Sequence, residues 1–189
     1  FSGHKVYAAP GTGVLYGRRE LLDQLPPYRG GGEMIQTVSW EHTSYAEVPQ
    51  RFEAGTQNIS GTPTLVPALE LAGAMNNSSV IKEEESLIRD YVLAELADRP
   101  HIHHFGRPDD TSGKINLYSF TVDGAHHEDL ALILDKMGVA VRSGQMCAEP
   151  LMDRFGVTGM VRASFSPFNT LEEARYFISS LDRAISMLK

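Results

Sequence analysis

The sequence predicts a mixed α/β and α+β protein built from two consecutive parts. Short apolar runs bounded by glycine alternate with amphipathic helical patterns along the chain. A polar break at Asn76–Ser79 separates two of the helical patterns. The composition, with 42% hydrophobic and 22% charged residues, is that of an ordinary globular protein. We expect the two parts to span residues 1–76 and 77–189.

The first part is expected to hold two short strands and two helices. Val14–Tyr16 is an apolar run between glycines and is typical of a buried strand. Arg19–Leu25 predicts a short helix that stops at a pair of prolines, and Ile35–Trp40 predicts a second strand. Thr62 is expected to cap the next helix, with proline at its first position. Three apolar residues are spaced to share one face of that helix: Leu65, Leu69 and Ala72.

The second part is predicted to alternate helices and strands. A long helix over Val80–Ala97 and a shorter one over Glu128–Met137 each present an apolar face. Thr170-x-x-Glu173 is a capping box that opens a final helix. The apolar face of the long helix is predicted to comprise Ile81, Leu87, Ile88, Tyr91, Val92 and Leu96. Strands are predicted at Ile102–Phe105, Ile115–Val122, Val139–Val141 and Val161–Phe165.

Charge and cysteine content restrict the function classes. The formal net charge of −7 makes binding to nucleic acid or to an anionic membrane through bulk charge a poor expectation. The single cysteine excludes an internal disulfide and a metal site of several cysteines, and it fits a reducing, cytoplasmic location. The chain opens at Phe1 with no methionine and no signal-peptide pattern, so we expect it to be a fragment of a longer protein or one part of a cleaved one.

Two residues are candidates for nucleophilic chemistry. Lys5 follows a serine and a histidine that suit a phosphate, and a lysine amine can form a Schiff base, although a solvated surface lysine is the commoner case. Cys147 follows a predicted strand among small, flexible residues, where functional loops occur. Arg142 would favour its thiolate if the loop folds back. The alternative for Cys147 is a small buried apolar residue.

One arginine in an apolar strand and two histidine clusters complete the candidates. Arg162 lies inside an apolar strand, where its planar fork suits either a substrate carboxylate or a structural ion pair. The His101–His104 tract lacks cysteines and carboxylates at ligand spacing, so it predicts an exposed strand edge rather than a metal site. His126 and His127 fit the solvated start of a helix. No metal site is predicted.

Six segments together resemble the group II cysteine desulfurases of the class V aminotransferase family, which include selenocysteine lyase-like members. The segments keep the family's order and spacing along the whole chain, and the set is specific although each one alone is weak. They are FSGHK (1–5), GVLYG (13–17), PPYRGGGEMI (26–35), RFEAGT (51–56), VRSGQMCAEPLM (141–152) and VRASFSPFNT (161–170).

The resemblance implies a role for four residues of the first part. Lys5 matches the lysine that binds pyridoxal 5'-phosphate (PLP) covalently. Ser2 and His4 match neighbours that contact the cofactor phosphate, and Thr56 matches a threonine that reaches the phosphate in the other subunit of a homodimer. The resemblance covers only the C-terminal half of such an enzyme. It therefore implies an incomplete PLP site in this chain, and a fold-type I architecture with the end of the large domain at 1–76 and the small C-terminal domain at 77–189.

Three residues of the second part also match. Cys147 matches the loop cysteine that accepts sulfur as a persulfide, Arg162 the arginine that binds the substrate carboxylate, and Arg142 the arginine that supports the substrate site. Family members often carry two histidines before the cysteine, where this chain has Gln145 and Met146.

The function implied by the resemblance is cysteine desulfuration, which converts L-cysteine to L-alanine and leaves a persulfide for iron–sulfur cluster assembly. Its implied partners are a second copy of the chain, the N-terminal half of the enzyme and a sulfur-acceptor protein. Selenocysteine lyase and cysteine sulfinate desulfinase are the alternatives within the enzyme class. The alternative outside it is an inactive fragment that serves only in dimerisation or binding.

Overall fold

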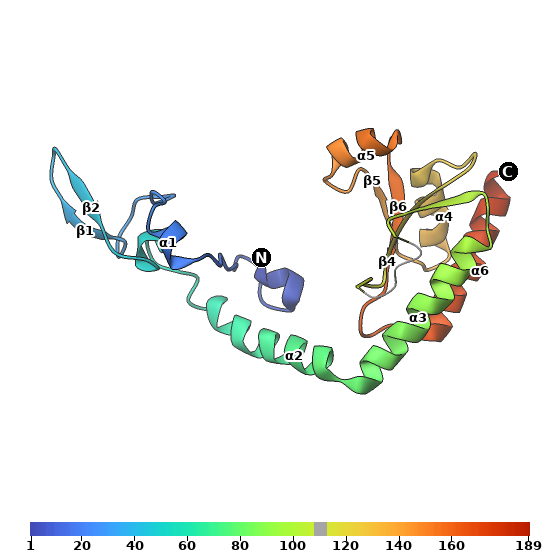
Figure 1. Cartoon of the computed structure of the whole chain (residues 1–189), viewed down its shortest axis with the longest axis horizontal. Helices are drawn as coiled ribbons and strands as arrows, with labels where there is room; N and C mark the ends of the chain where they lie inside the picture. Colours follow the sequence, from blue (N-terminus) through green and yellow to red (C-terminus); the bar gives the residue numbers. More distant parts are fainter. Residues whose placement is uncertain (108–112) are drawn as a thin grey trace. The chain divides into compact units, whose positions relative to one another are not determined.

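The computed structural model describes residues 1–107 and 113–189 and divides the chain into two compact units (Figure 1). Unit 1 comprises Phe1–Asn77 and unit 2 comprises Ser78–Lys189. The mixed α/β content predicted from the sequence is confirmed. Within the described residues, no helix is both long and apolar enough to cross a bilayer.

Unit 1 is a chain of short elements around one β-hairpin. The strands β1 (Ile35–Val38) and β2 (Thr43–Tyr45) pair antiparallel, and the confirmed helix α1 (Arg19–Leu22) is shorter than expected. The remaining elements are the 3-10 turns η1 (Gly3–Val6), η2 (Gln50–Phe52) and η3 (Thr62–Thr64) and the helix α2 (Leu65–Asn77).

Two predictions for unit 1 are wrong. Val14–Tyr16 is not a strand, and its side chains are exposed, with Tyr16 at 90%. A strand needs a neighbouring strand, and in the described chain this segment has backbone hydrogen bonds only between Val14 and Phe1, next to an isolated bridge between Ser2 and Gly13. Thr62 does not cap a helix, because it begins the turn η3 and α2 starts only at Leu65.

The buried face of α2 also differs from the predicted one. Leu69 is exposed, whereas Ala68 and Met75 are buried. Leu69 lies in the middle of the predicted face, and it directly follows the buried Ala68 in the helix. Since one residue is about 100° of helical rotation, the large apolar side chain falls outside the covered face.

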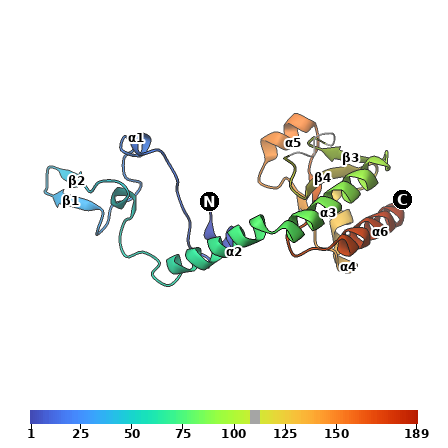
Figure 2. The same ribbon diagram turned by 60° about the horizontal axis from the view of Figure 1, so that its bottom comes forward.

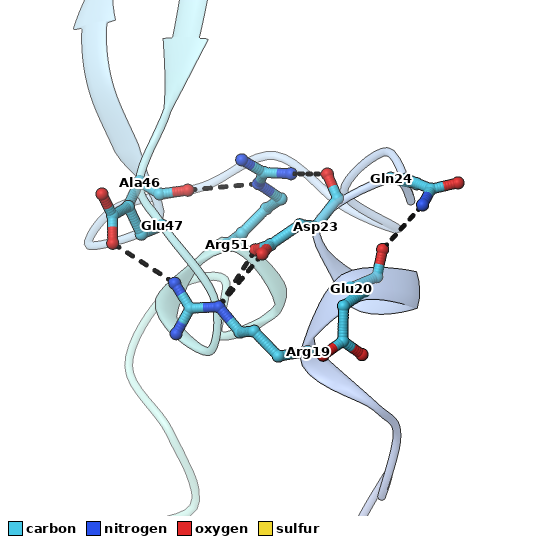
Figure 3. Close-up of polar contacts among 7 residues, drawn as sticks. All are labelled: Arg19, Glu20, Asp23, Gln24, Ala46, Glu47 and Arg51. Carbon is cyan, nitrogen blue, oxygen red and sulfur yellow. Dashed lines mark hydrogen bonds and ion pairs between the residues drawn. The ribbon is translucent and has the colours of Figure 1, made fainter.

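Two arginines hold the centre of unit 1 together (Figure 3). The Arg51 guanidinium donates to the Ala46 carbonyl at 3.2 Å and to the Asp23 carbonyl at 2.9 Å. Arg19 bonds the Asp23 carboxylate at 3.2 Å and Glu47 at 3.3 Å. These contacts join the end of α1 to the segment after β2, and they fix the start of the RFEAGT segment (51–56).

In its described residues, unit 2 is a four-stranded antiparallel sheet with order β3-β4-β6-β5 and four helices. The predicted strand at Ile102–Phe105 is confirmed with its ends. The predicted strands at Ile115–Val122 and Val161–Phe165 and the predicted helices over Val80–Ala97 and Glu128–Met137 are confirmed with shifted ends. The strands are β3 (Ile102–Phe105), β4 (Leu117–Val122), β5 (Arg142–Gly144) and β6 (Met160–Ser164). The helices are α3 (Ser79–Ala97), α4 (His127–Lys136), α5 (Glu149–Phe155) and α6 (Leu171–Leu188).

One face of this sheet carries the core. Along β4 every second residue is buried, because strand side chains alternate between the two faces. Tyr118 and Phe120 on β4 and Val161 and Ala163 on β6 belong to one core cluster with buried residues of α3, α4 and α6. The opposite face therefore carries Ser119 and the other alternate residues.

The helices α3 and α6 lie side by side in both views (Figure 2). Arg99, just past the end of α3, joins them by a two-pronged contact to Asp182 at 2.7 Å for each nitrogen. This hydrogen bonding is the main reason that the pKa of Arg99 lies above its ordinary value. Leu87, predicted on the apolar face of α3, is exposed at 48%, so the buried stripe is narrower and runs through Ile88, Val92 and Leu96.

The segment Val139–Val141 is not a strand, which corrects one of the four strands predicted for unit 2. Pairing begins three residues later, where Arg142 lies opposite Arg162 on β6. The short helix α5 is not predicted from the sequence, although proline at its first turn is a helix-start signal. The final helix is confirmed. The Thr170 hydroxyl accepts from the Glu173 amide at 3.2 Å, and the Glu173 carboxylate accepts from the Thr170 amide at 2.9 Å.

Candidate functional site

The Ser2–Lys5 segment of unit 1 lies on a closed loop. Its turn η1 is held where the Gly3 amide donates to the Thr12 carbonyl at 2.9 Å. A side chain at Gly3 would meet the Thr12 hydroxyl at 2.2 Å, so only glycine fits this crossing. The Ala9 amide donates to the Thr64 hydroxyl at 2.9 Å and ties the loop to the start of α2. The sequence therefore builds a fixed platform for the residues on η1.

Ser2, His4 and Lys5 supply three polar side chains within four residues. His4 and Lys5 are exposed and Ser2 is half-buried. In the described part of the chain, no side chain pairs with the Lys5 amine. A hydroxyl, an imidazole and an amine form a donor set that suits a phosphate, and the free amine suits an aldehyde. These residues therefore fit PLP.

Thr56 ends the RFEAGT segment at a tight turn. Gly55 has a φ of +75°, which glycine adopts without strain, and its amide donates to the Gly32 carbonyl at 2.9 Å. The turn thus rests against the triple-glycine segment, and the Thr56 side chain is exposed. No described side chain forms a hydrogen bond with the Thr56 hydroxyl.

Arg142 and Arg162 are direct cross-strand neighbours in unit 2. The antiparallel register of β5 and β6 pairs Arg142 with Arg162. Residues directly opposite one another leave the same face of a sheet, and two like charges there are destabilising. Since Val161 and Ala163 face the core, the two guanidinium groups leave the other face. Two cations on adjacent strands make a site for an anion.

Arg162 is the more enclosed of the two. Its side chain is half-buried, and its Nε atom is buried with no hydrogen-bond acceptor among the described residues. The structural ion pair considered from the sequence is therefore not seen in this part of the chain. A buried donor without a partner is costly, which indicates that an acceptor belongs there.

Cys147 lies on the loop that connects β5 to α5. It is exposed, so the buried apolar alternative is wrong. The loop folds back far enough for a terminal nitrogen of Arg142 to lie 3.3 Å from Cys147 Sγ. From the sequence, this contact was expected only if the loop folds back, and the structure shows that the loop does so.

The backbone of the loop is strained at the cysteine. Met146 has a φ of +58° and Cys147 a φ of +60°, and neither is glycine. A left-handed conformation costs a non-glycine residue roughly 1–2 kcal/mol. The Gln145 side chain donates to the Glu149 carboxylate at 2.9 Å and supports the loop from its far end. Such strain is concentrated at functional sites. The sequence carries no signal for it.

The histidine clusters do not form a site in the described residues. His103, on the edge strand β3, contacts Asp123 at 2.7 Å, as fits an exposed strand edge. Burial lowers the pKa of His104, and Lys114 lowers it further. Burial likewise lowers the pKa of His127 at the start of α4. Across residues 1–107 and 113–189, no group of three metal-ligating side chains could hold a metal ion.

The structure thus brings three of the seven predicted site residues into one cluster. In unit 2, Arg142 lies opposite Arg162 in the β5–β6 pair and forms one hydrogen bond with Cys147. The residues of unit 1 divide between the η1 loop, with Ser2, His4 and Lys5, and the Gly55 turn, with Thr56. The sequence did not predict that Gln145 and Glu149 hold the loop, although their spacing of four residues is a possible signal.

The fold and the arrangement of the candidate site residues are those of one protein family. The profile of the family "Aminotransferase class-V" matches residues 1–177, and the chain belongs to that family. The fold is accordingly part of a fold-type I PLP enzyme.

Three individual relatives, one known by its sequence and two by their structures, are each named as a cysteine desulfurase. The chain is 40% identical over 188 residues to a "Probable cysteine desulfurase" of Vibrio cholerae, covering 100% of this chain and 45% of that protein. The solved cysteine desulfurase CsdA of Escherichia coli, in its S-sulfonic acid form, matches with a TM-score of 0.85 and 37% identity over 100% of this chain and 46% of that one. An apo cysteine desulfurase of Thermococcus onnurineus matches with a TM-score of 0.87 and 34% identity, over 98% and 46%. The chain spans about 45% of the length of the curated relatives that it matches.

Proposed function

We propose that this chain is the C-terminal part of a PLP-dependent cysteine desulfurase, which converts L-cysteine to L-alanine and an enzyme persulfide. One observation carries the proposal. An exposed cysteine lies 3.3 Å from an arginine that stands directly opposite a second arginine whose buried Nε has no acceptor in the described chain. A nucleophilic sulfur beside an anion site is what desulfuration of an amino acid requires.

The residues of unit 1 would hold the cofactor. Lys5 would bind PLP covalently, while Ser2 and His4 would donate to its phosphate. When bound, PLP supplies an electron sink for the carbon atoms of the substrate. Lys5 would move a proton at the substrate Cα. We expect this chain to supply only part of the cofactor site, and the N-terminal half of the enzyme is the proposed source of the remaining contacts.

The residues of unit 2 would bind the substrate and take its sulfur. The Arg162 fork would bind the substrate carboxylate, with support from Arg142. The Cys147 thiolate would attack the substrate sulfur, so that a sulfur–sulfur bond forms and the carbon–sulfur bond breaks. The electron pair of the broken bond stays with carbon, which takes a proton and leaves as alanine.

We further propose the domain to which each unit belongs, the oligomeric state, the sulfur acceptor and the location of the enzyme. Unit 1 would be the end of the PLP-binding large domain and unit 2 the small C-terminal domain. A homodimer would form, and a sulfur-acceptor protein would carry the persulfide sulfur to iron–sulfur cluster assembly. A cytoplasmic location would keep the exposed thiol of Cys147 reduced.

The test uses the holoenzyme that contains this chain. We expect incubation with L-cysteine to release L-alanine in step with a gain of one sulfur atom on the peptide that carries Cys147, as seen by mass spectrometry. Incubation with L-serine, which lacks the sulfur, is the control. A colourless protein that releases no alanine would instead support the inactive binding fragment.

Arg162→Lys separates substrate binding from a structural role. The change keeps the charge but loses the two-pronged fork, so we expect cysteine binding to weaken by about 1–3 kcal/mol, the size of a lost charged hydrogen bond. The measurement is KM for L-cysteine. Arg154→Lys, at an exposed position on α5, is the matched control. An unchanged KM in Arg162→Lys would return Arg162 to a structural role.

Thr56 tests the proposed homodimer. A two-fold symmetric dimer would place each Thr56 at the site of the partner subunit. In a crystal structure of the holoenzyme, we expect the Thr56 hydroxyl to lie nearer the amine of the partner subunit's Lys5 than that of its own Lys5. A monomer in solution, or a Thr56 remote from both lysines, would contradict the assignment.

A further inference from the structure

The turn that carries Cys147 has a backbone conformation that its residues do not favour. The Ala148 amide donates to the Gln145 carbonyl at 2.9 Å, which closes a turn with Met146 and Cys147 at its two central positions. Both central residues have a positive φ, as in a type I′ turn, where glycine, asparagine and aspartate are the usual residues. One backbone hydrogen bond contributes about as much as a single left-handed residue costs, so it does not offset two. The turn therefore needs support from side chains.

One side-chain hydrogen bond spans this turn. Gln145, at the first position of the turn, donates from its Nε2 atom to Glu149 Oε1 at 2.9 Å. Glu149 is the first residue of α5 and directly follows the last residue of the turn. A carboxylate accepts a stronger hydrogen bond than a neutral oxygen does. Because the bond joins the two ends of the turn, it opposes opening of the backbone between them.

The helix α5 gives Glu149 a fixed base. Met152, on the same helix, is buried with 4% of its surface exposed. The ring of Phe155, at the end of α5, lies 4.9 Å from the ring of Phe105 on the strand β3. At its other end the turn directly follows β5, which pairs with β6. The turn is thus held between a paired strand and a packed helix of unit 2.

We propose that Gln145 and Glu149 are positioning residues for sulfur transfer, because their hydrogen bond holds the turn that presents Cys147 Sγ to the substrate sulfur. This role rests on the proposed function, and the bonds made and broken are those of the reaction given there. Neither residue is assigned contact with the reacting atoms. A displacement of about 1 Å lowers the rate of such a reaction on the order of a hundredfold. A fixed turn therefore favours the step in which sulfur moves to Cys147.

Two substrates separate positioning of the cysteine from general support of the site. Selenium leaves readily without thiolate attack, so selenocysteine cleavage depends little on the place of Cys147. In the holoenzyme, we expect Glu149→Ala to lower kcat for L-cysteine by roughly three- to tenfold, the equivalent of one lost hydrogen bond. We expect KM for L-cysteine and turnover of L-selenocysteine to stay close to those of the parent enzyme. Glu149→Gln keeps an acceptor oxygen, and it is expected to retain most of the cysteine activity.

A double variant tests whether the two residues act through one bond. Gln145→Ala breaks the same hydrogen bond as Glu149→Ala, so we expect the double variant to lose no more cysteine activity than either single variant. Asp153→Ala, at an exposed position one turn further along α5, removes the same charge and is the matched control, expected to behave as the parent enzyme.

The outcomes that would overturn the positioning role differ from the one that would overturn the proposed function. Unchanged cysteine turnover in Glu149→Ala, equal losses on both substrates, or losses that add up in the double variant would each overturn the positioning role alone. A parent holoenzyme that turns over neither substrate would overturn the proposed function itself.

Discussion

Lys5→Ala is expected to abolish turnover of both cysteine and selenocysteine in the holoenzyme that contains this chain. In the proposed mechanism every step depends on the Lys5 amine, which holds the cofactor and moves a proton at the substrate. Lys5 is exposed and pairs with no described side chain, so its removal costs little packing. The measurement is release of alanine from each substrate.

A second lysine controls for the loss of charge. Lys136→Ala, at an exposed position in the last turn of α4, changes the net charge by the same amount and is expected to retain full activity. Activity retained by Lys5→Ala on either substrate would contradict the cofactor assignment, whatever the behaviour of Lys136→Ala.

Cys147→Ser is expected to remove cysteine desulfuration and to spare selenocysteine cleavage at least in part. A hydroxyl is a poor nucleophile toward sulfur without a strong base, whereas selenium leaves readily without thiolate attack. The two substrates are compared in the same preparation, so the second serves as the internal control. Equal loss on both substrates would show damage to the site rather than loss of the sulfur carrier.

The same variant tests the loop position of Cys147. Because its side chain is exposed, we expect the change to alter the free energy of unfolding by no more than about 0.5 kcal/mol. A variant that loses several kcal/mol of stability, of the size expected for a core residue, yet retains desulfurase activity while folded would mean that Cys147 serves packing rather than chemistry.

Elements with strong local signals were predicted from the sequence. The final helix followed from the capping box of Thr170 and Glu173, whose two hydrogen bonds are both present. The sheet strand β6 followed from its apolar run. These signals are local, because capping and alternation depend on residues within one or two turns of each other.

Elements that depend on distant partners were predicted poorly. Val139–Val141 is apolar and holds two β-branched valines, yet the strand begins at Arg142, because the register with Arg162 decides where pairing starts. Val14–Tyr16 has the composition of a strand, but among the described residues it lacks a strand to pair with. Local propensity does not contain this information.

The site was predicted as a set of residues and not as an arrangement. The resemblance gave each of Arg142, Arg162 and Cys147 a role, and the sequence related only Arg142 and Cys147, on the condition that the loop folds back. Their relation comes from a strand register and from the left-handed backbone at Met146 and Cys147, and both are products of tertiary structure. Sequence spacing alone could not place one arginine between the other two residues.

The uneven distribution of the core between the two units has a consequence for how the chain melts. Of the hydrophobic residues buried in the described chain, unit 1 contributes only Ala8, Met34, Val48, Ala68 and Met75, and all the others belong to unit 2. Cooperative unfolding requires a shared, extensive core. A calorimetric trace of this chain would therefore report the melting of unit 2 almost alone, and its midpoint would say little about the platform that carries Lys5.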